Sequence, residues 1–421
     1  MVDLRQIIAR NRAGAAVAIP SVCTAHPESL EASLTLAQDL DQAVVVEATS
    51  NQVNQEGGYT GLRPAEFIGF VTDIAVGAGV DPARILFGGD HLGPQAWRKA
   101  AADVAMDKAH RLVADFAAAG FTKIHLDCSE GCANEPAQLP DEVTATRSAA
   151  LAETARAHAP DPERLIFVIG TEVPPPGGAR TDAHGDIPPT EPKAAAATLE
   201  AHRLAFAARG LPLDQIGGLV VQPGVEFTPM TVHPLPMDRD PGLRAVLADW
   251  PGLCLEAHST DYQTPETYVR LAELGFAFQK VGPALTFAWR EALYALDALR
   301  AQNGWATGPG LADVMESVML DQPGYWQGHY TGALADLRTE RHFGLADRIR
   351  YYWPDPRAQQ AVRQLFADLE GKRLPDPVVL AYFRADEIAS ARKSRHSLPR
   401  ALALAHVQSA LRPYFLTESR S

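Results

Sequence analysis

Cysteine is scarce in this chain of 421 residues, which has only four. The two nearest in sequence, Cys128 and Cys132, do not have the two-residue spacing of zinc ribbons or redox pairs. Cys23, Cys128 and Cys254 lie on or just after apolar runs, so we interpret them as small core residues. The cysteines therefore indicate neither a metal site nor a redox site.

Positive charge and long apolar runs are also lacking. The formal net charge is -13, which argues against nucleic acid or an anionic membrane as the main partner, because both require a basic face. No run of about 18 apolar residues is present to span a bilayer, and residues 1–14 do not read as a secretory signal. We therefore expect a cytoplasmic protein. The negative net charge still allows an anionic small substrate, because a few local Lys or Arg side chains are enough to bind one.

Two nucleotide-binding signatures are missing as well. No G-x-G-x-x-G sequence opens a helix after the first predicted strand, which counts against a doubly wound sheet, the runner-up fold. The chain also has no G-x-x-x-x-G-K-[ST] loop and no kinase-type catalytic loop. The sequence therefore does not predict a kinase.

Apolar strands and helices alternate along the first 300 residues. The strands are apolar throughout, as expected for parallel strands buried on both faces, and eight such strands with intervening helices predict an α/β fold, a (β/α)₈ TIM barrel. Residues 301–421 are predicted to be a helical extension packed on the barrel domain of residues 1–300. The predicted strands are 15–21, 43–48, 85–89, 122–126, 165–169, 217–221, 253–257 and 276–281, and helices include 28–40, 102–119 and 193–208.

Polar residues follow these strands at their carboxyl ends, where a barrel carries its chemistry. Imidazole and carboxylate together suit zinc, manganese or a similar divalent ion, and a carboxylate beside them can move protons. Asp90 and His91, framed by glycines, are the clearest such pair. The alternative for a lone Asp-His pair is a local turn cap and a local hydrogen bond. The strand-end residues are Glu47, Asp90, His91, Asp127, Glu172, Gln222, His258 and Lys280.

We expect His91, His258 and Glu172 to hold the metal, because they converge from three strand ends. Lys280 and the backbone near Ser259 and Gly282 are predicted to hold an anion, since the last two strand ends of such barrels often bind phosphate. A Schiff-base role for Lys280 is the alternative. The alternative for Glu47 and Asp127 is that each only caps the helix or loop that follows it. The alternative for His258 is a hydrogen-bonded histidine of the core.

Several adjoining motifs resemble one family over nearly the whole chain. They are NQEGGYTG at 54–61, GGDHLGP at 88–94, KIHLDCSEGCA at 123–133, GTEVPPPGG at 170–178 and RIRYYW at 348–353. These are similar to the Z subunit of tagatose-bisphosphate aldolase, also called tagatose-6-phosphate kinase, which is associated with tagatose and galactitol catabolism. The resemblance implies either an accessory subunit of a class II aldolase or a C4-epimerase that interconverts tagatose and fructose forms.

Class II aldolases add a further resemblance. They carry an Asp-His pair after one strand, as proton donor and metal ligand, and two more histidine ligands on later strands. Asp90-His91 looks like the first element and His258-Ser259 like the last. At the intermediate position this sequence offers Gln222, where the aldolase pattern has histidine.

These features together predict an isomerase, a metal-dependent C4-epimerase of D-tagatose 6-phosphate and D-fructose 6-phosphate, or of the free ketohexoses. The C4 hydrogen is not α to the C2 carbonyl, so the reaction requires retro-aldol cleavage and re-addition. We expect Asp90, Asp127 and Glu172 to be catalytic. The alternative is a non-catalytic subunit, and the chain is expected to form a homo-oligomer or a complex with an aldolase. The expected substrate contacts are Glu47, Gln222, Ser259, Lys280 and Gly282.

Overall fold

Eight parallel strands close into a barrel in the computed structural model, which describes residues 3–170 and 187–416. Their order around the barrel is β1-β10-β9-β6-β5-β4-β3-β2, so each strand pairs with the next barrel strand in the chain and β10 closes on β1. The (β/α)₈ prediction is confirmed. The strands are β1 (Ile19–Val22), β2 (Val44–Thr49), β3 (Ile85–Leu92), β4 (Lys123–Leu126), β5 (Ile166–Ile169), β6 (Ile216–Val220), β9 (Cys254–Ala257) and β10 (Phe276–Val281).

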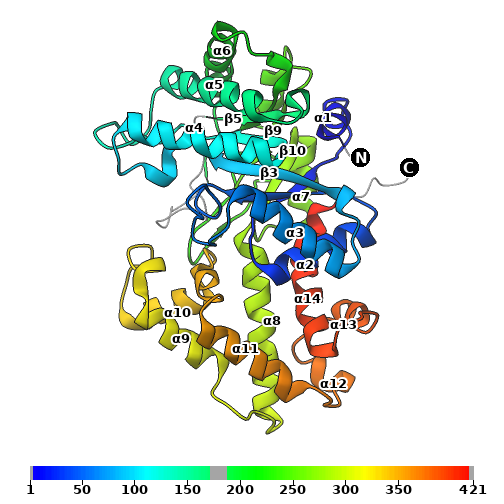
Figure 1. Cartoon of the computed structure of the whole chain (residues 1–421). Helices are drawn as coiled ribbons and strands as arrows, with labels where there is room; N and C mark the ends of the chain where they lie inside the picture. The colour runs from blue at the N-terminus through cyan, green and yellow to red at the C-terminus, as the bar shows by residue number, and fades with distance from the viewer. Residues whose placement is uncertain (1–2, 171–186, 417–421) are drawn as a thin grey trace.

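Helices surround this barrel (Figure 1), and local sequence signals set their ends. Pro64 occupies the first turn of α3, where its missing N–H costs no hydrogen bond. Gly79 and Gly120 end α3 and α4 in the left-handed conformation, with φ of 72° and 103°. The barrel helices are α2 (Pro27–Asp39), α3 (Pro64–Ala78), α4 (Ala102–Ala119), α5 (Asp141–His158), α6 (Pro192–Ala208), α7 (Pro265–Glu273) and α8 (Pro283–Gln302).

The segment between β6 and β9 departs from the prediction that each strand is followed by a helix. It forms a short hairpin of β7 (Glu226–Phe227) and β8 (Val232–His233), then the 3₁₀ turn η5 (Leu243–Leu247). Prolines at 223, 229, 234, 236, 241 and 251 recur too often for a helix, because each lacks an N–H and clashes with the preceding turn.

The barrel interior is apolar near the amino ends of the strands and charged near their carboxyl ends. Helix α1 (Leu4–Arg12) covers the amino-terminal end of the barrel and inserts Leu4 and Ile8 into the apolar layer. Lys123 marks the boundary, with Nζ 5.1 Å from the ring centroid of Phe278. The apolar layer consists mainly of Ile19, Val45, Leu86, Ile166, Val168, Val220 and Phe278, all buried.

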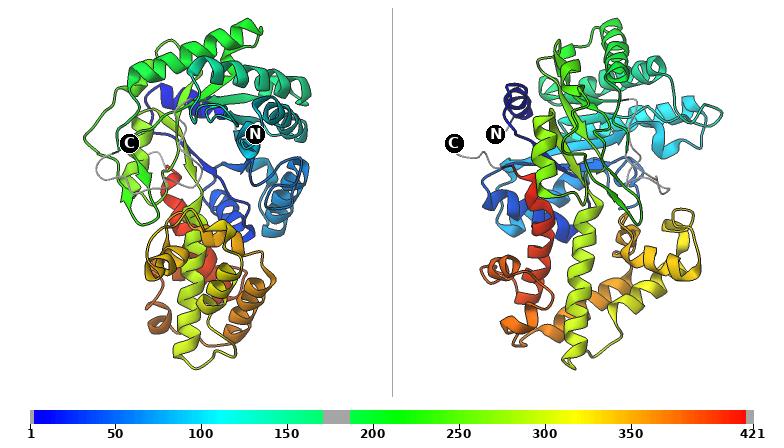
Figure 2. Two further views of the ribbon diagram at one scale, coloured as in Figure 1. Left: turned by 90° about the vertical axis from the view of Figure 1, so that its left-hand side faces the viewer. Right: turned by 180° about the vertical axis from the view of Figure 1, so that it is seen from behind.

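The helical extension lies at one side of the barrel (Figures 1 and 2). Helix α8 runs out of the barrel into it, and α14 returns against α8 and α2. The predicted boundary at residue 300 falls in the last turn of α8. Among the described residues no helix is long and apolar enough to cross a membrane. The extension contains α9 (Leu311–Asp321), α10 (Leu334–Phe343), η7 (Arg348–Tyr352), α11 (Pro356–Leu369), α12 (Asp376–Val379), α13 (Ala385–Ala391) and α14 (Leu398–Leu411).

Candidate active site

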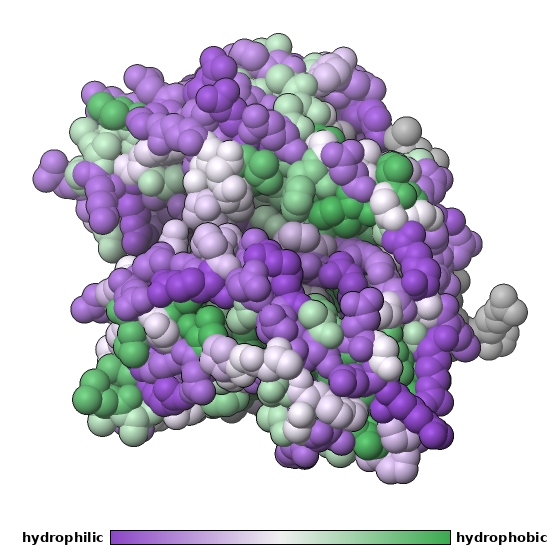
Figure 3. All heavy atoms as spheres, turned by 60° about the horizontal axis from the view of Figure 1, so that its bottom comes forward, coloured by the Kyte–Doolittle hydropathy of each residue, from purple (hydrophilic) through white to green (hydrophobic). Residues whose placement is uncertain are grey.

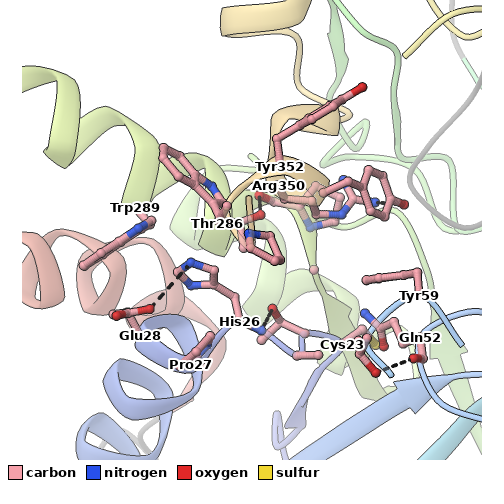
Figure 4. Close-up of a pocket in the computed structure, with 18 of the residues that line it drawn as sticks. Cys23, His26, Pro27, Glu28, Gln52, Tyr59, Thr286, Trp289, Arg350 and Tyr352 are labelled. Carbon is pink, nitrogen blue, oxygen red and sulfur yellow. Dashed lines mark hydrogen bonds and ion pairs between the residues drawn. The ribbon is translucent and has the colours of Figure 1, made fainter. Parts of the chain in front are cut away.

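A cavity of about 970 Å³ lies between the carboxyl ends of the strands and the extension. Figure 4 shows Cys23, Gln52 and Tyr59 on its barrel side and Arg350 and Tyr352 on the extension side. The volume is in the usual range for a small-molecule site. From the barrel the lining includes Asp90, His91, His258, Ser259 and Lys280, and from the extension Tyr351 and Trp353.

Three imidazoles meet at the barrel end of this cavity. His91 ends β3, His125 lies on β4, and His258 directly follows β9. The ring centroid of His91 is 4.9 Å from that of His125 and 5.3 Å from that of His258, and His125 and His258 are 5.3 Å apart. Among the described residues the buried Nε2 of His125 has no hydrogen-bond partner, so it has a lone pair or a proton to offer a ligand.

A carboxylate contacts each of these rings. Asp127 Oδ2 lies 2.7 Å from His91 Nδ1, and Asp90 Oδ1 lies 2.9 Å from His125 Nδ1. Glu256 Oε1 lies 2.8 Å from His258 Nε2. Such contacts fix the orientation of a metal-binding imidazole.

Burial and neighbouring charges pull the imidazole pKa values apart. Burial alone would lower the pKa of His91, but the carboxylates of Asp90 and Asp127 outweigh it and the pKa is raised. Burial, together with the Lys280 ammonium, lowers the pKa of His258 to about 3, although Glu256 opposes the shift. His258 is therefore a neutral imidazole, the form that coordinates a metal.

A buried ion network lies beneath the imidazoles. Lys123 Nζ is 2.6 Å from both Glu47 Oε1 and Glu256 Oε2. Lys280 Nζ is 2.7 Å from Glu47 Oε2 and also pairs with Asp90. Burial would raise the pKa of the Glu47 and Asp90 carboxyls, but the nearby cations outweigh it and lower both pKa values.

The backbone around the site is specialised. A Cβ on Gly93 would lie 1.7 Å from the carbonyl oxygen of Asp127, and one on Gly88 would lie 2.8 Å from Glu47 Cγ. These two glycines of the GGDHLGP motif therefore allow neighbouring groups to approach the strand closely. His91 and Ser259 have left-handed φ values of 49° and 53°, a conformation that costs free energy and is found preferentially at functional sites.

These residues fit a divalent metal ion. One ligand atom from each of Asp90, His91 and His125 lies within 4.8 Å of the others, and His125, Glu256 and His258 form a second such group. Three buried carboxylates, Glu47, Asp90 and Glu256, face two lysines, so the network has an excess of negative charge that a cation would neutralise. His125 belongs to both groups, and its Nε2, which has no partner among the described residues, is the observation that most favours an ion here.

The structure brings together most of the strand-end residues predicted from the sequence. The side chain of Gln222 is elsewhere, and its Oε1 accepts hydrogen bonds from the N–H groups of Gly224 and Val225. Ser259 and Gly282 line the cavity. Glu172 lies outside the described residues. The residues placed in one connected group are Glu47, Asp90, His91, Asp127, His258 and Lys280.

Several residues of the site were missed in the sequence. Lys123 and His125 lie within the fourth strand and Glu256 within β9, whereas the predicted site consists mainly of residues at the strand ends. The signal was alternation: Lys123, His125 and Asp127 occur at every second position, and so do Glu256 and His258, which places each set on the inner face of the barrel. Cys23, interpreted as a core residue, instead lines the cavity with its Sγ 3.2 Å from Glu47 Oε2.

The fold and this site define a (β/α)₈-barrel protein whose cavity has, at its barrel end, imidazoles and carboxylates that fit a divalent metal ion. The D-tagatose-1,6-bisphosphate aldolase subunit GatZ/KbaZ-like family matches residues 4–418. The chain belongs to this family.

Its relatives carry three different names. A "D-tagatose 6-phosphate 4-epimerase" of Agrobacterium fabrum is 46% identical over 385 residues, covering 90% of each chain. The "D-tagatose-1,6-bisphosphate aldolase subunit GatZ" of Klebsiella pneumoniae subsp. pneumoniae is 43% identical over 417 residues, covering 98% of each. A solved structure from Sinorhizobium meliloti 1021, described as a probable tagatose 6 phosphate kinase, has a TM-score of 0.86 and 43% identity, covering 94% of this chain and 99% of that one.

Proposed function

We propose that this chain is an isomerase, a metal-dependent C4-epimerase that interconverts D-tagatose 6-phosphate and D-fructose 6-phosphate. The observation that carries the proposal is the group of three imidazoles, each oriented by a carboxylate, beside the ionised Asp90. The 46% identity to a relative named as this epimerase supports the same substrate.

His91, His125 and His258 are the proposed metal ligands, and zinc is the ion that best suits neutral imidazole, with manganese as the alternative. Glu172 stays a predicted ligand. A divalent ion bound there would polarise the C2 carbonyl and stabilise the enediolate that cleavage produces. Gln222 is not part of the proposed site, because its side chain is engaged in its own turn.

Asp90 has the role of proton acceptor and donor at the C4 oxygen. As it removes the hydroxyl proton, the C3–C4 bond breaks, C4 becomes an aldehyde and the bonding electron pair passes to the C1–C3 enediolate. The aldehyde turns and C3 adds to its other face, after which the C4 oxygen regains a proton. Asp127 is held by His91 and Ser129 and so positions His91, which leaves Glu172 as the predicted acid on the second face.

The direct test uses the isolated chain with Zn²⁺ and tagatose 6-phosphate, followed by NMR. A substrate deuterated at C4 is expected to give fructose 6-phosphate that keeps its deuterium in ordinary water, because only the C3–C4 bond is broken. Loss of the label to water would rule out the retro-aldol route.

An accessory subunit of a class II aldolase is the second candidate. The GatZ relative has that name, and exposed apolar side chains on α9 and α10 offer a contact surface: Leu320 is 53%, Leu334 86% and Phe343 53% exposed. Figure 3, with the extension forward, shows separate hydrophobic groups among hydrophilic ones on this side. Failure of the isolated chain to epimerise, with activity appearing only in a complex with an aldolase chain, would favour this candidate.

A further inference from the structure

The donors expected to bind a phosphate at the barrel end of the cavity are already engaged by carboxylates of the chain itself. Lys280 pairs with Glu47 and Asp90. The N–H groups of Gly282 and Ala284, which begin α8, donate to Asp261 Oδ1 at 3.0 Å and 2.9 Å. An anion at these positions would have to displace a buried carboxylate or remain beside it, which like-charge repulsion disfavours.

Four Lys or Arg side chains line the cavity in the part of the chain that the structure describes: Lys280, Arg350, Arg363 and Arg400. Arg400 pairs with Glu31 at 2.7 Å and Glu28 at 3.5 Å. Arg363 is exposed and donates to the amide oxygen of Gln360. Arg350 is half-buried and has no Asp or Glu within ion-pair distance among residues 3–170 and 187–416, so its charge has no direct counter-ion there.

Neutral groups hold the Arg350 guanidinium in place. Its Nη1 donates to the carbonyl oxygens of Ala346 and Asp347, and its Nη2 donates to the Tyr351 hydroxyl at 2.9 Å. Its Cζ lies 4.5 Å from the ring centroid of Tyr351. Its side chain also hydrogen-bonds the Tyr59 hydroxyl, so four of the five N–H donors of a guanidinium are engaged and one is left for a ligand.

The glycine-rich motif at 54–61 completes this corner of the cavity. The ring of Tyr59 meets the edge of Tyr351 at 5.0 Å, so a loop of the barrel contacts η7 of the extension. Gly58 enables the loop, because its φ is +54° and a Cβ there would lie 2.3 Å from the carbonyl oxygen of Gln52. The motif therefore places the aromatic ring of Tyr59 in contact with Tyr351, beside Arg350.

We propose that Arg350 binds the phosphate of a ketose 6-phosphate, while carbons 1 to 3 of the sugar face the imidazoles across the cavity. This inference rests on the proposed function. The remaining N–H donor of Arg350 and its permanent positive charge can bind a phosphate oxygen at the cavity wall. The unphosphorylated C1 end then lies at Lys280 and Gly282, whose donors are engaged by carboxylates, which explains why the site would favour a 6-phosphate over a 1,6-bisphosphate.

The test compares the full chain, loaded with Zn²⁺, with its Arg350→Gln, Arg350→Lys and Arg363→Gln variants. Arg350→Gln is expected to raise the KM for tagatose 6-phosphate by about 10- to 100-fold, because hydrogen bonds to a charged group are lost, with the KM for free tagatose unchanged. Arg350→Lys should retain part of the affinity. Arg363→Gln removes the same charge from the same cavity and should change neither KM.

Equal effects of Arg350→Gln on both sugars, or a larger effect of Arg363→Gln, would overturn the inference. Titration with glucitol 6-phosphate, which has no carbonyl to react, separates this result from failure of the proposed function. If the wild-type chain epimerises neither sugar but binds glucitol 6-phosphate in an Arg350-dependent way, the phosphate site stands and the reaction is wrong. If it epimerises the sugar phosphate and Arg350→Gln binds glucitol 6-phosphate as tightly as wild type, the site is wrong.

Discussion

The barrel wall and the extension wall of the cavity differ in how their charges are compensated. On the barrel side Lys280 pairs with Glu47 and Asp90, and beneath the imidazoles the fully buried Lys123 pairs with Glu47 and Glu256. On the extension side Arg350 rests against Tyr351 and carbonyl oxygens, with no carboxylate as a direct partner among the described residues. The barrel wall therefore holds groups suited to bond breaking, whereas the extension wall offers a charge to the ligand.

The difference has a physical cause. A buried charge is costly unless it is paired, and the barrel interior is closed on all sides by strands and by α1, so its charges must pair inside it. Arg350 lies at the edge of a cavity that solvent can enter, where an unpaired guanidinium is tolerated. Variants of the two walls should accordingly fail in different ways.

The largest effect is expected on the barrel wall. Asp90→Asn should lower turnover by a factor on the order of 10² to 10⁴, the usual contribution of one proton-transfer group, with bound metal retained. His125→Ala is the matched variant and should lose the metal as well as the activity. Elemental analysis beside turnover measurements distinguishes the two, and full metal content in His125→Ala would contradict the proposed ligand set.

A smaller effect concerns stability. Lys123→Met should destabilise the fold by about 3–5 kcal/mol, because it removes one of the two buried cations that pair with Glu47 and Glu256. Arg84→Met, which removes the exposed pair with Asp41, should cost less than about 1 kcal/mol. Urea unfolding monitored by tryptophan fluorescence measures both, and similar values for the two variants would mean that the network is not stabilising.

The smallest effect concerns the pH dependence of stability, for which we compare one histidine of the extension with one of the barrel, both outside the cavity. In the extension, burial opposes charging of His406, but Glu291 and Glu387 outweigh it and raise its pKa to about 9. In the barrel shell, burial lowers the pKa of His202 on α6 to about 4. Stability from His406 is therefore complete below about pH 6.5 and lost as pH rises towards 9, whereas stability from His202 is lost as pH falls from about 6.5 towards 4.

Each contribution is on the order of 2–3 kcal/mol. Unfolding free energies at pH 5, 6.5 and 9 should show the alkaline loss reduced in His406→Gln and the acid loss reduced in His202→Gln. Curves for both variants that run parallel to the wild-type curve would show that these histidines do not couple to folding.

The sequence predicted the architecture well because apolar strands and helix signals are local. Residues 102–119 were predicted as a helix and form α4 with the same ends, since Gly120 stops it. The prediction of a helix after each strand was wrong for residues 222–252, although the prolines of this stretch argue against a helix. Of the site, the strand-end residues Asp90, His91 and His258 were identified, while His125 and Glu256 were overlooked because they lie within apolar strands.

The sequence alone determined the barrel, because its strand pattern, glycines and prolines act through neighbouring residues. Only the tertiary structure decided which charges are available to a ligand. The sequence predicted that Lys280 binds an anion, but in the fold its charge is paired with Glu47 and Asp90 from two other strands. Arg350 is the proposed phosphate-binding residue because the extension covers the carboxyl ends of the barrel strands and places Arg350 in the cavity wall. The pairing of charges depends on distances across the fold, and such distances are set by packing of segments far apart in the chain.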